Sequence, residues 1–177
     1  MRSTLDKLIS WTGLALALVL LVAGGLLTWA NQFVADQVDN QFSMQGITMP
    51  AGPALESLSK ADADALKKYA GTPLDSGPKA RAYADHYILA HMNAQGEGVQ
   101  KEFPQEREAE GPITYEEASG FGRALSAAVA ENPNATEQEQ EAASAWMDLR
   151  ESPFMGNTLR GLLLYGYAFA TIGTIAG

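Results

Sequence analysis

The chain of 177 residues contains no cysteine, and this absence excludes several classes of site. Disulfide bonds, iron–sulfur clusters, thiolate zinc sites and covalently attached c-type haem all require cysteine, so none of them forms within this chain. Histidine is nearly as scarce, with only His86 and His91. Five positions apart on a helix, the two imidazoles lie on different faces, and no neighbouring residues complete the three or four ligands of a zinc site.

Catalytic signatures are also missing. The sequence has no G-x-S-x-G element, no Ser-His-Asp order, no P-loop and no dinucleotide-binding fingerprint. The acidic clusters, Asp62 with Asp64 and the group from Glu106 to Glu110, lack the glycine turn and ligand order of a calcium-binding loop. His91 lies on an otherwise apolar helical stripe and is expected to be a hydrogen-bonded core residue. We therefore predict that the protein is not an enzyme and holds no metal or cofactor.

Basic residues are few, 12 against 21 acidic ones, for a net charge of −9. Between positions 31 and 153 there are 9 basic and 20 acidic side chains, a net charge of −11. Nucleic-acid binding needs clustered cations, so it is excluded, as is adsorption to anionic lipid headgroups. A basic cytochrome c domain or Ca²⁺ could be drawn to such a segment, although an ordinary solvated surface is the simpler interpretation.

Two long apolar runs lie at the ends of the chain, Leu8 to Thr28 and Phe154 to Gly177. Each is long enough to cross a bilayer, which takes about 20 helical residues. In the first run Trp11 and Trp29 are 18 positions apart, about 27 Å of helix, which matches the two interfacial belts of a membrane. We predict a transmembrane helix over residues 8–30.

A cleaved signal peptide is the alternative for the first run. Arg2 and Lys7 form a basic start, and Thr28 to Ala30 resembles a cleavage site. The apolar core of a signal peptide has about 7–15 residues, however, and this run is longer. The membrane anchor is therefore the favoured interpretation.

The second run is predicted to be a transmembrane helix over residues 153–177. Ser152 and Pro153 form a typical helix start, with Ser as the cap and Pro at the first helical position. Arg160 is the only charge in the run. Its guanidinium either reaches back to the headgroups or pairs with a group of a partner subunit.

Basic residues at the N-terminus set the expected orientation, because positive charge stays on the cytoplasmic side. Residues 1–7 are predicted to be cytoplasmic, and residues 31–152 to form an acidic, helical domain outside the membrane. The predicted fold is an all-α plasma-membrane protein, a two-helix hairpin with both ends cytoplasmic and an extracytoplasmic helical domain.

Apolar spacing and turn residues divide the outer domain. An extended segment is expected at residues 42–50, after the first helix has continued through residues 31–41. Thr114 with Glu117 and Thr136 with Glu139 each fit a capping box, which marks the start of a helix. Helices are predicted at about residues 54–70, 79–95, 115–131 and 137–151, with Gly96 ending the second and a loop over residues 97–112.

Small residues form a stripe along each predicted transmembrane helix. Such stripes let helix backbones approach closely, and they mark packing faces in lipid. One alternative is that the two helices pack only on each other, and the other is that they dock onto another protein. We predict partner contacts at Gly13, Ala17 and Gly24 in the first helix and at Arg160, Gly166, Ala170 and Gly173 in the second, with Gly177 continuing the second stripe.

Four short segments carry a resemblance to known proteins. They are Gln45 to Pro50 (QGITMP), Tyr83 to Asp85 with His91, Ile113 to Glu117 (ITYEE) and Phe154 to Arg160 (FMGNTLR). With this layout, the chain resembles a set of small actinobacterial membrane proteins with two spanning helices and a helical outer segment. Residues 98–111 and the long helix at 137–151 depart from that pattern.

Proteins of this type resemble accessory subunits of the actinobacterial respiratory supercomplex, which joins a menaquinol–cytochrome c reductase to a terminal oxidase. The resemblance therefore implies a non-catalytic subunit that assembles or stabilises such a complex. Its partners would be larger integral membrane subunits and lipids. The alternative is an envelope-associated binding or sensor protein with a small-ligand or metal site near Tyr87 and His91.

Overall fold

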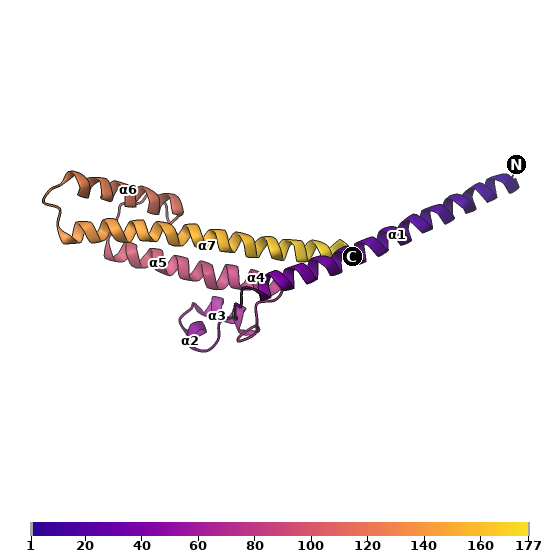
Figure 1. Ribbon diagram of the computed structural model, residues 1–177, viewed down its shortest axis with the longest axis horizontal. Coiled ribbons are helices and arrows are strands. Elements are labelled where there is room, and N and C mark those ends of the chain that lie inside the picture. Colours follow the sequence, from indigo (N-terminus) through magenta and orange to yellow (C-terminus); the bar gives the residue numbers. More distant parts are fainter. Residues whose placement is uncertain (1, 177) are drawn as a thin grey trace.

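The computed structural model describes residues 2–176, and over that range every regular element is a helix. In chain order the elements are α1 (Arg2–Ser43), α2 (Pro53–Glu56), α3 (Lys60–Lys67), α4 (Gly77–Tyr83), the π-helix η1 (Ala84–Ile88), α5 (Leu89–Glu102), α6 (Tyr115–Glu131) and α7 (Glu137–Ala176). Figure 1 shows α5 and α6 lying along the first part of α7, with α2 and α3 to one side of α4. The all-helical prediction is confirmed for these residues.

Helix α1 is a single rod of 42 residues, about 63 Å long. Its N-terminal part projects away from the rest of the molecule, and only its C-terminal part lies beside other helices (Figure 1). Among the helices of residues 2–176, α1 is the one that is long and apolar enough to cross a membrane, with a mean hydropathy of 2.2 over its most apolar window. The expected continuation through residues 31–41 is confirmed.

Helix α7 has 40 residues and continues through Pro153, so the prediction of a helix ending at residue 151 and a new one starting at Pro153 is wrong. Proline has no N–H for the carbonyl one turn earlier, and inside a helix it costs about 3 kcal/mol. Pro153 is itself buried, and Trp146, Leu149 and Leu163 are buried on either side of it. This packing on both sides offsets the missing hydrogen bond.

The predicted helix over residues 54–70 is instead two short helices, α2 and α3. Ser59 ends the break between them, and its side chain accepts a hydrogen bond from the backbone N–H of Asp62. A capping serine competes with helix continuation by bonding its own backbone. The predicted continuous helix was therefore wrong in the middle, where Ser57 and Ser59 lie.

The predicted helix over residues 79–95 begins earlier, at Gly77, and continues to Glu102. Gly96 does not end it, because this residue is buried inside α5, where an added Cβ would lie 3.0 Å from Ile113. Close approach of the chain at Ile113, not a turn, is the reason for a glycine here. The loop predicted from residue 97 starts only after Glu102.

The segment predicted to be extended, residues 42–50, is extended only at its end. Helix α1 continues to Ser43, and a turn follows. Met49 N–H then donates to the Thr72 carbonyl (2.8 Å), Leu74 N–H donates to the Ile47 carbonyl (2.9 Å), and an isolated β-bridge joins Thr48 to Pro73. These bonds join the residues that follow α1 to the residues that follow α3.

Two apolar clusters hold together the part of the chain that follows the apolar run of α1. The first joins the end of α1 to α3, α4, η1 and α7, and its buried members include Phe42, Met49, Leu66, Ala84 and Leu163. The second lies between α6 and α7 around Trp146, whose indole is fully buried, donates a hydrogen bond to the Phe103 carbonyl (3.1 Å) and packs edge-on against Phe121 (4.9 Å between ring centroids).

Both predicted capping boxes are present. Thr114 accepts from the Glu117 N–H and Glu117 accepts from the Thr114 N–H (2.9 Å). Thr136 and Glu139 exchange the same two bonds at the start of α7. Helix α6 therefore has the bounds that the sequence predicts, residues 115–131.

Candidate functional site

Two glycines of α7 lie directly against α1. A Cβ on Gly166 would lie 2.5 Å from Phe42 Cζ, and one on Gly173 would lie 2.9 Å from Asn31 Oδ1. Glycine lets the two helices approach so closely that no other side chain fits without displacing a neighbour. The stripe predicted on the second apolar run is thus a packing face, and the residues that meet it belong to this chain.

Helix α4 covers the next part of the same face. A Cβ on Gly77 would lie 2.9 Å from Ala170 Cβ and 3.2 Å from Tyr167 Cα. Gly166, Ala170 and Gly173 therefore contact α1 or α4, which favours packing within the chain over contact with a partner for these three. Gly177 lies outside the described residues.

These contacts show which part of α1 lies beside the second apolar run. Gly166 is level with Phe42 and Gly173 with Asn31, so α7 runs antiparallel to α1 and meets it beyond the first apolar run. Within the segment predicted as the second transmembrane helix, Gly166 and Gly173 lie beside residues 31–42 and not beside residues 8–28, whereas Gly156 lies against Met92 of α5. The two-span hairpin therefore stays a prediction.

The predicted stripe on α1 is open. A Cβ added at Gly13 or Gly24 would meet no neighbouring atom within 4 Å, and Ala17 is exposed. Apart from Ala23, which is half-buried, every residue from Arg2 to Trp29 is exposed. The predicted partner contacts of Gly13, Ala17 and Gly24 stay predictions.

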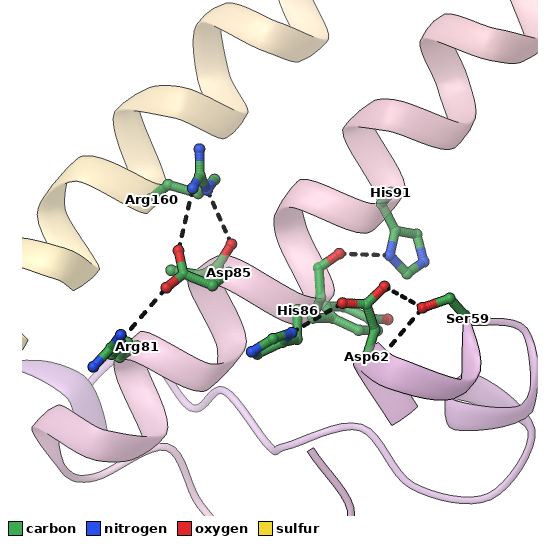
Figure 2. Close-up of polar contacts among 9 residues, drawn as sticks. Ser59, Asp62, Arg81, Asp85, His86, His91 and Arg160 are labelled. Carbon is green, nitrogen blue, oxygen red and sulfur yellow. Dashed lines mark hydrogen bonds and ion pairs between the residues drawn. The ribbon is translucent and has the colours of Figure 1, made fainter. Parts of the chain in front are cut away.

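Arg160 makes its contacts within the chain. Its Nε donates to the Ala84 carbonyl (3.0 Å), and one terminal nitrogen lies 3.2 Å from Asp85 Oδ1. Arg81 approaches the other oxygen of Asp85 (3.7 Å) and donates to the Tyr167 hydroxyl (3.0 Å). Figure 2 shows Asp85 between the two arginines. The group joins α4 and η1 to α7, and Asp85 is the partner of Arg160 that sequence reasoning did not identify.

The second polar group joins α3 to η1. His86 Nδ1 lies 2.9 Å from Asp62 Oδ1, and the Ser59 hydroxyl donates to the other carboxylate oxygen (2.6 Å). The Ser59 hydrogen bond, followed by that of His86, holds the pKa of Asp62 below its ordinary value. His86 and Asp85 are adjacent in sequence, yet they face different elements (Figure 2).

The two histidines are not brought together. His91 Nδ1 is 2.8 Å from the Tyr87 carbonyl, and its ring packs on the Tyr87 ring (4.3 Å between centroids), which in turn packs on Tyr83 (4.9 Å). The expectation that His91 is hydrogen-bonded is confirmed, whereas the expectation that it belongs to a core is wrong, because its side chain is exposed. Within residues 2–176 no three His, Asp or Glu side chains are close enough to hold a metal ion.

Asp85 and His86 lie in the π-helix η1. A π-helix adds a residue to the helical turn, and such turns are frequent at functional sites. Neighbouring residues of a helix point about 100° apart around its axis, so Asp85 faces α7 while His86 faces α3. The sequence carries no signal for a π-turn, so η1 itself was not expected.

Two surface hollows adjoin these groups. A polar one of about 530 Å³ is lined by polar residues that include Lys68, Arg81 and His86, and by Tyr167. An apolar one of about 380 Å³ lies between α1 and α7. We call it the α1–α7 groove, and its lining residues are Phe33, Val34, Gln37, Val38, Gln41, Phe42, Gln45, Leu162, Gly166 and Phe169.

Sequence reasoning missed the α1–α7 groove. Its two walls are more than 100 positions apart in the chain, and no local pattern shows that residues 33–45 and 162–169 lie side by side. The only signal was the length of α1 beyond its apolar run.

Comparison with known proteins gives no relative. No protein-family model matches the chain, and neither the curated proteins nor the solved structures include a significant match.

Proposed function

We propose that this protein is a non-catalytic accessory subunit of a larger plasma-membrane assembly, anchored by the apolar part of α1. One observation carries the proposal: residues 2–29 of α1 are almost entirely exposed, including Leu14, Leu18, Leu21 and Val22. An apolar surface of that length is stable in lipid or against other membrane helices, and not in water.

The polar groups of the outer part support a structural role. Asp85 is shared by Arg81 and Arg160, and Asp62 is shared by Ser59 and His86. Each group ties two or three helices together and uses its charged atoms in doing so. The outer domain is therefore proposed to be a rigid, acidic support carried by α1.

We propose that α1 spans the membrane at residues 8–30, with the N-terminus cytoplasmic and the domain that follows extracytoplasmic. In this placement the end of α7 reaches the outer membrane surface beside Asn31. The hairpin predicted from the sequence, with residues 153–177 also inside the bilayer, is the alternative topology. It requires α7 to slide along α1, which would break the contacts of Gly166 with Phe42 and of Arg160 with Asp85.

The absence of cysteine makes the topology directly testable. Single cysteines replacing Ser3, Gln140 and Thr174 can be labelled from outside intact cells with a membrane-impermeant maleimide. We expect labelling at 140 and 174 and none at 3. Protection at 174 together with labelling at 140 would favour the hairpin, and labelling at 3 would overturn the orientation.

The short segments that resemble actinobacterial proteins make the respiratory supercomplex the first assembly to test. Full-length protein purified from native membranes in mild detergent should carry larger integral membrane subunits and their haem absorbance. Gly13→Leu with Gly24→Leu should reduce that co-purification, because both glycines are open and neither supports the fold.

Gly25→Leu is the matched control. Gly25 is equally open, but it lies about 100° around the helix from Gly24, outside the small-residue stripe. Equal recovery of the subunits with the double variant (Gly13→Leu and Gly24→Leu) and with the Gly25→Leu control would count against the stripe as a contact face. Recovery of no larger membrane subunit with the unaltered protein would count against the proposed function itself.

A second function is favoured by one observation. A polar groove beside His91 is lined by α2–α3 and α5 residues that include Ser59, Asp62, Asn93 and Glu97, which suits an envelope protein that binds a small ligand. A metal ion would be held by fewer than three of these side chains, because no three His, Asp or Glu within residues 2–176 lie close enough together. Zn²⁺ should then raise the melting temperature of the full-length protein in detergent, and His91→Ala should abolish the rise. An unchanged melting temperature would remove the metal from consideration.

A further inference from the structure

The α1–α7 groove is uncharged, although it lies in a strongly acidic domain. All of its lining residues are apolar or carry an amide. Asp36 and Asp39, which belong to the same stretch of α1, are exposed outside it. On its rim the side chains of Phe169 and Leu162 are 60% and 62% exposed. Exposed apolar groups of this size, gathered in one hollow, mark a site of contact.

The height of the groove above the membrane excludes lipid as its occupant. With Trp29 at the outer interface, Phe33 lies about 6 Å and Phe42 about 20 Å further along the helix axis. Acyl chains end at the interface, so they do not reach this level. Water and protein are the two remaining occupants, and an uncharged hollow rimmed by exposed aromatic and aliphatic side chains favours protein.

The register of α1 shows where the covering segment comes from. Val34 in the groove is one heptad from Leu27 and two heptads from Leu20 in the membrane segment, and positions seven apart lie on nearly the same helix face. The lower end of the groove thus continues directly into a membrane-facing surface of α1. A helix that packs along Leu20 and Leu27 enters the groove when it leaves the bilayer.

We propose that the α1–α7 groove receives the extracytoplasmic end of a partner's membrane-spanning helix, a segment of two to three turns that is apolar and uncharged. This inference rests on the proposed function and adds the docking surface and the chemistry of the partner. The groove and the membrane face of α1 form one continuous contact strip, and the outer domain contributes the α7 wall.

A second copy of this chain fits the strip poorly. Copies in one membrane share an orientation, so pairing along the strip would place Asp36 and Asp39 of both copies at the same level. It would also bring together two domains that each carry a net charge of −11 between positions 31 and 153. Like charges at the same level destabilise such contacts, so the strip selects an uncharged segment of a different protein.

Photo-crosslinking in living cells tests this. Benzoylphenylalanine is placed in the full-length chain at Leu20 in the membrane segment, at Phe169 in the groove, or at Phe154, an aromatic of α7 with 61% exposure that lies outside the groove. We expect Leu20 and Phe169 to yield the same larger membrane protein. The crosslinked peptide from Phe169 should lie just outside a membrane span of that protein, and Phe154 should give no such product.

Gln41→Glu, read out with the Phe169 probe, tests the uncharged character of the groove. Burying a carboxylate in an apolar contact is unfavourable, so the crosslink should fall about tenfold or more. Asn40→Asp adds the same charge one position away, outside the groove lining, and should change the yield less than about twofold.

The outcomes separate this inference from the proposed function. A partner captured at Leu20 but not at Phe169 would overturn the groove assignment and leave the accessory subunit intact. Only a dimer of this chain, or only lipid, at Phe169 would also overturn it, as would equal capture at Phe154. No partner at either Leu20 or Phe169 would overturn both.

Discussion

Helices α1 and α7 are nearly equal in length, 42 and 40 residues, and each carries an apolar run, yet the chain uses them in opposite ways. The apolar part of α1 is uncovered, whereas the apolar part of α7 packs its small residues against Phe42, Asn31 and Gly77. Hydropathy separates them in the same way, because α1 is the one helix of residues 2–176 that is long and apolar enough to cross a membrane. The difference is that α7 packs against neighbouring helices of the same chain, whereas the apolar part of α1 has no such neighbours among the described residues.

The largest expected effect concerns membrane insertion, in which substitutions in α1 and α7 should differ most. Leu20→Arg should abolish stable insertion, because an arginine at the centre of a transmembrane helix costs about 2.5–3.5 kcal/mol or more. Tyr165→Arg, on an α7 side chain of similar exposure, should leave the protein in the membrane. Carbonate extraction measures both. Retention of Leu20→Arg in the pellet would mean that α1 is not the anchor.

The next effect tests whether the α7 stripe serves the fold. Gly166→Leu forces a side chain into the space of Phe42 and should lower the free energy of unfolding by about 1–3 kcal/mol. Gly161→Leu, on the same helix with nothing within 4 Å, should be neutral. Thermal melts in detergent report both. Adding Phe42→Ala to Gly166→Leu should restore part of the loss, and an additive loss would argue against the contact.

A smaller effect is expected from the polar tie between η1 and α7. Asp85→Asn removes the shared partner of Arg81 and Arg160 and should cost about 1–2 kcal/mol, since these side chains are only partly shielded from water. Asp64→Asn breaks an exposed pair with Lys60 and should leave stability nearly unchanged, because solvent screens the pair. Equal losses in the two variants would show that the tie adds nothing.

The smallest effect concerns acid. The Arg107 hydrogen bond, with those of Thr114, lowers the pKa of Glu117 to about 2 from the usual 4.5. A depressed folded-state pKa gives stability that is present above pH 4.5 and is lost as the pH falls towards 2. After discounting for screening by solvent, the loss is on the order of 1 kcal/mol.

Glu117→Gln should flatten this acid dependence in the α6–α7 region, measured by tryptophan fluorescence of buried Trp146, while the membrane part of α1 stays helical. An unchanged acid profile in the variant would show that the Glu117–Arg107 pair does not stabilise the start of α6.

Local signals predicted the elements that local interactions determine. The Thr114 and Thr136 boxes fixed the starts of α6 and α7, because side chain and backbone lie within one turn. The helix ends predicted at Pro153 and Gly96 were wrong because contacts with distant residues determine the structure there. Each looks like a helix end in sequence, but buried packing around Pro153 and the close approach of Ile113 to Gly96 outweigh the local preference.

The predicted site residues divide along the same line. Gly13, Ala17 and Gly24 are open, as a membrane-facing stripe would be, whereas Gly166, Ala170, Gly173 and Arg160 are engaged within the chain. Asp85 and Phe42, which engage Arg160 and Gly166, could not be identified beforehand. They are far away in sequence, and a contact between distant segments produces no periodic pattern in the sequence of either segment.

The sequence by itself determined that the chain is helical, that the part between its two apolar runs is acidic, and that one N-terminal run is fit to cross a bilayer. Those properties follow from composition and from spacing within a few turns. Only the tertiary structure decided where α7 lies along α1, which charges are shared, and that a groove opens between the two helices. Such features depend on which surfaces pack best once the chain is folded, and packing compares residues that the sequence keeps apart.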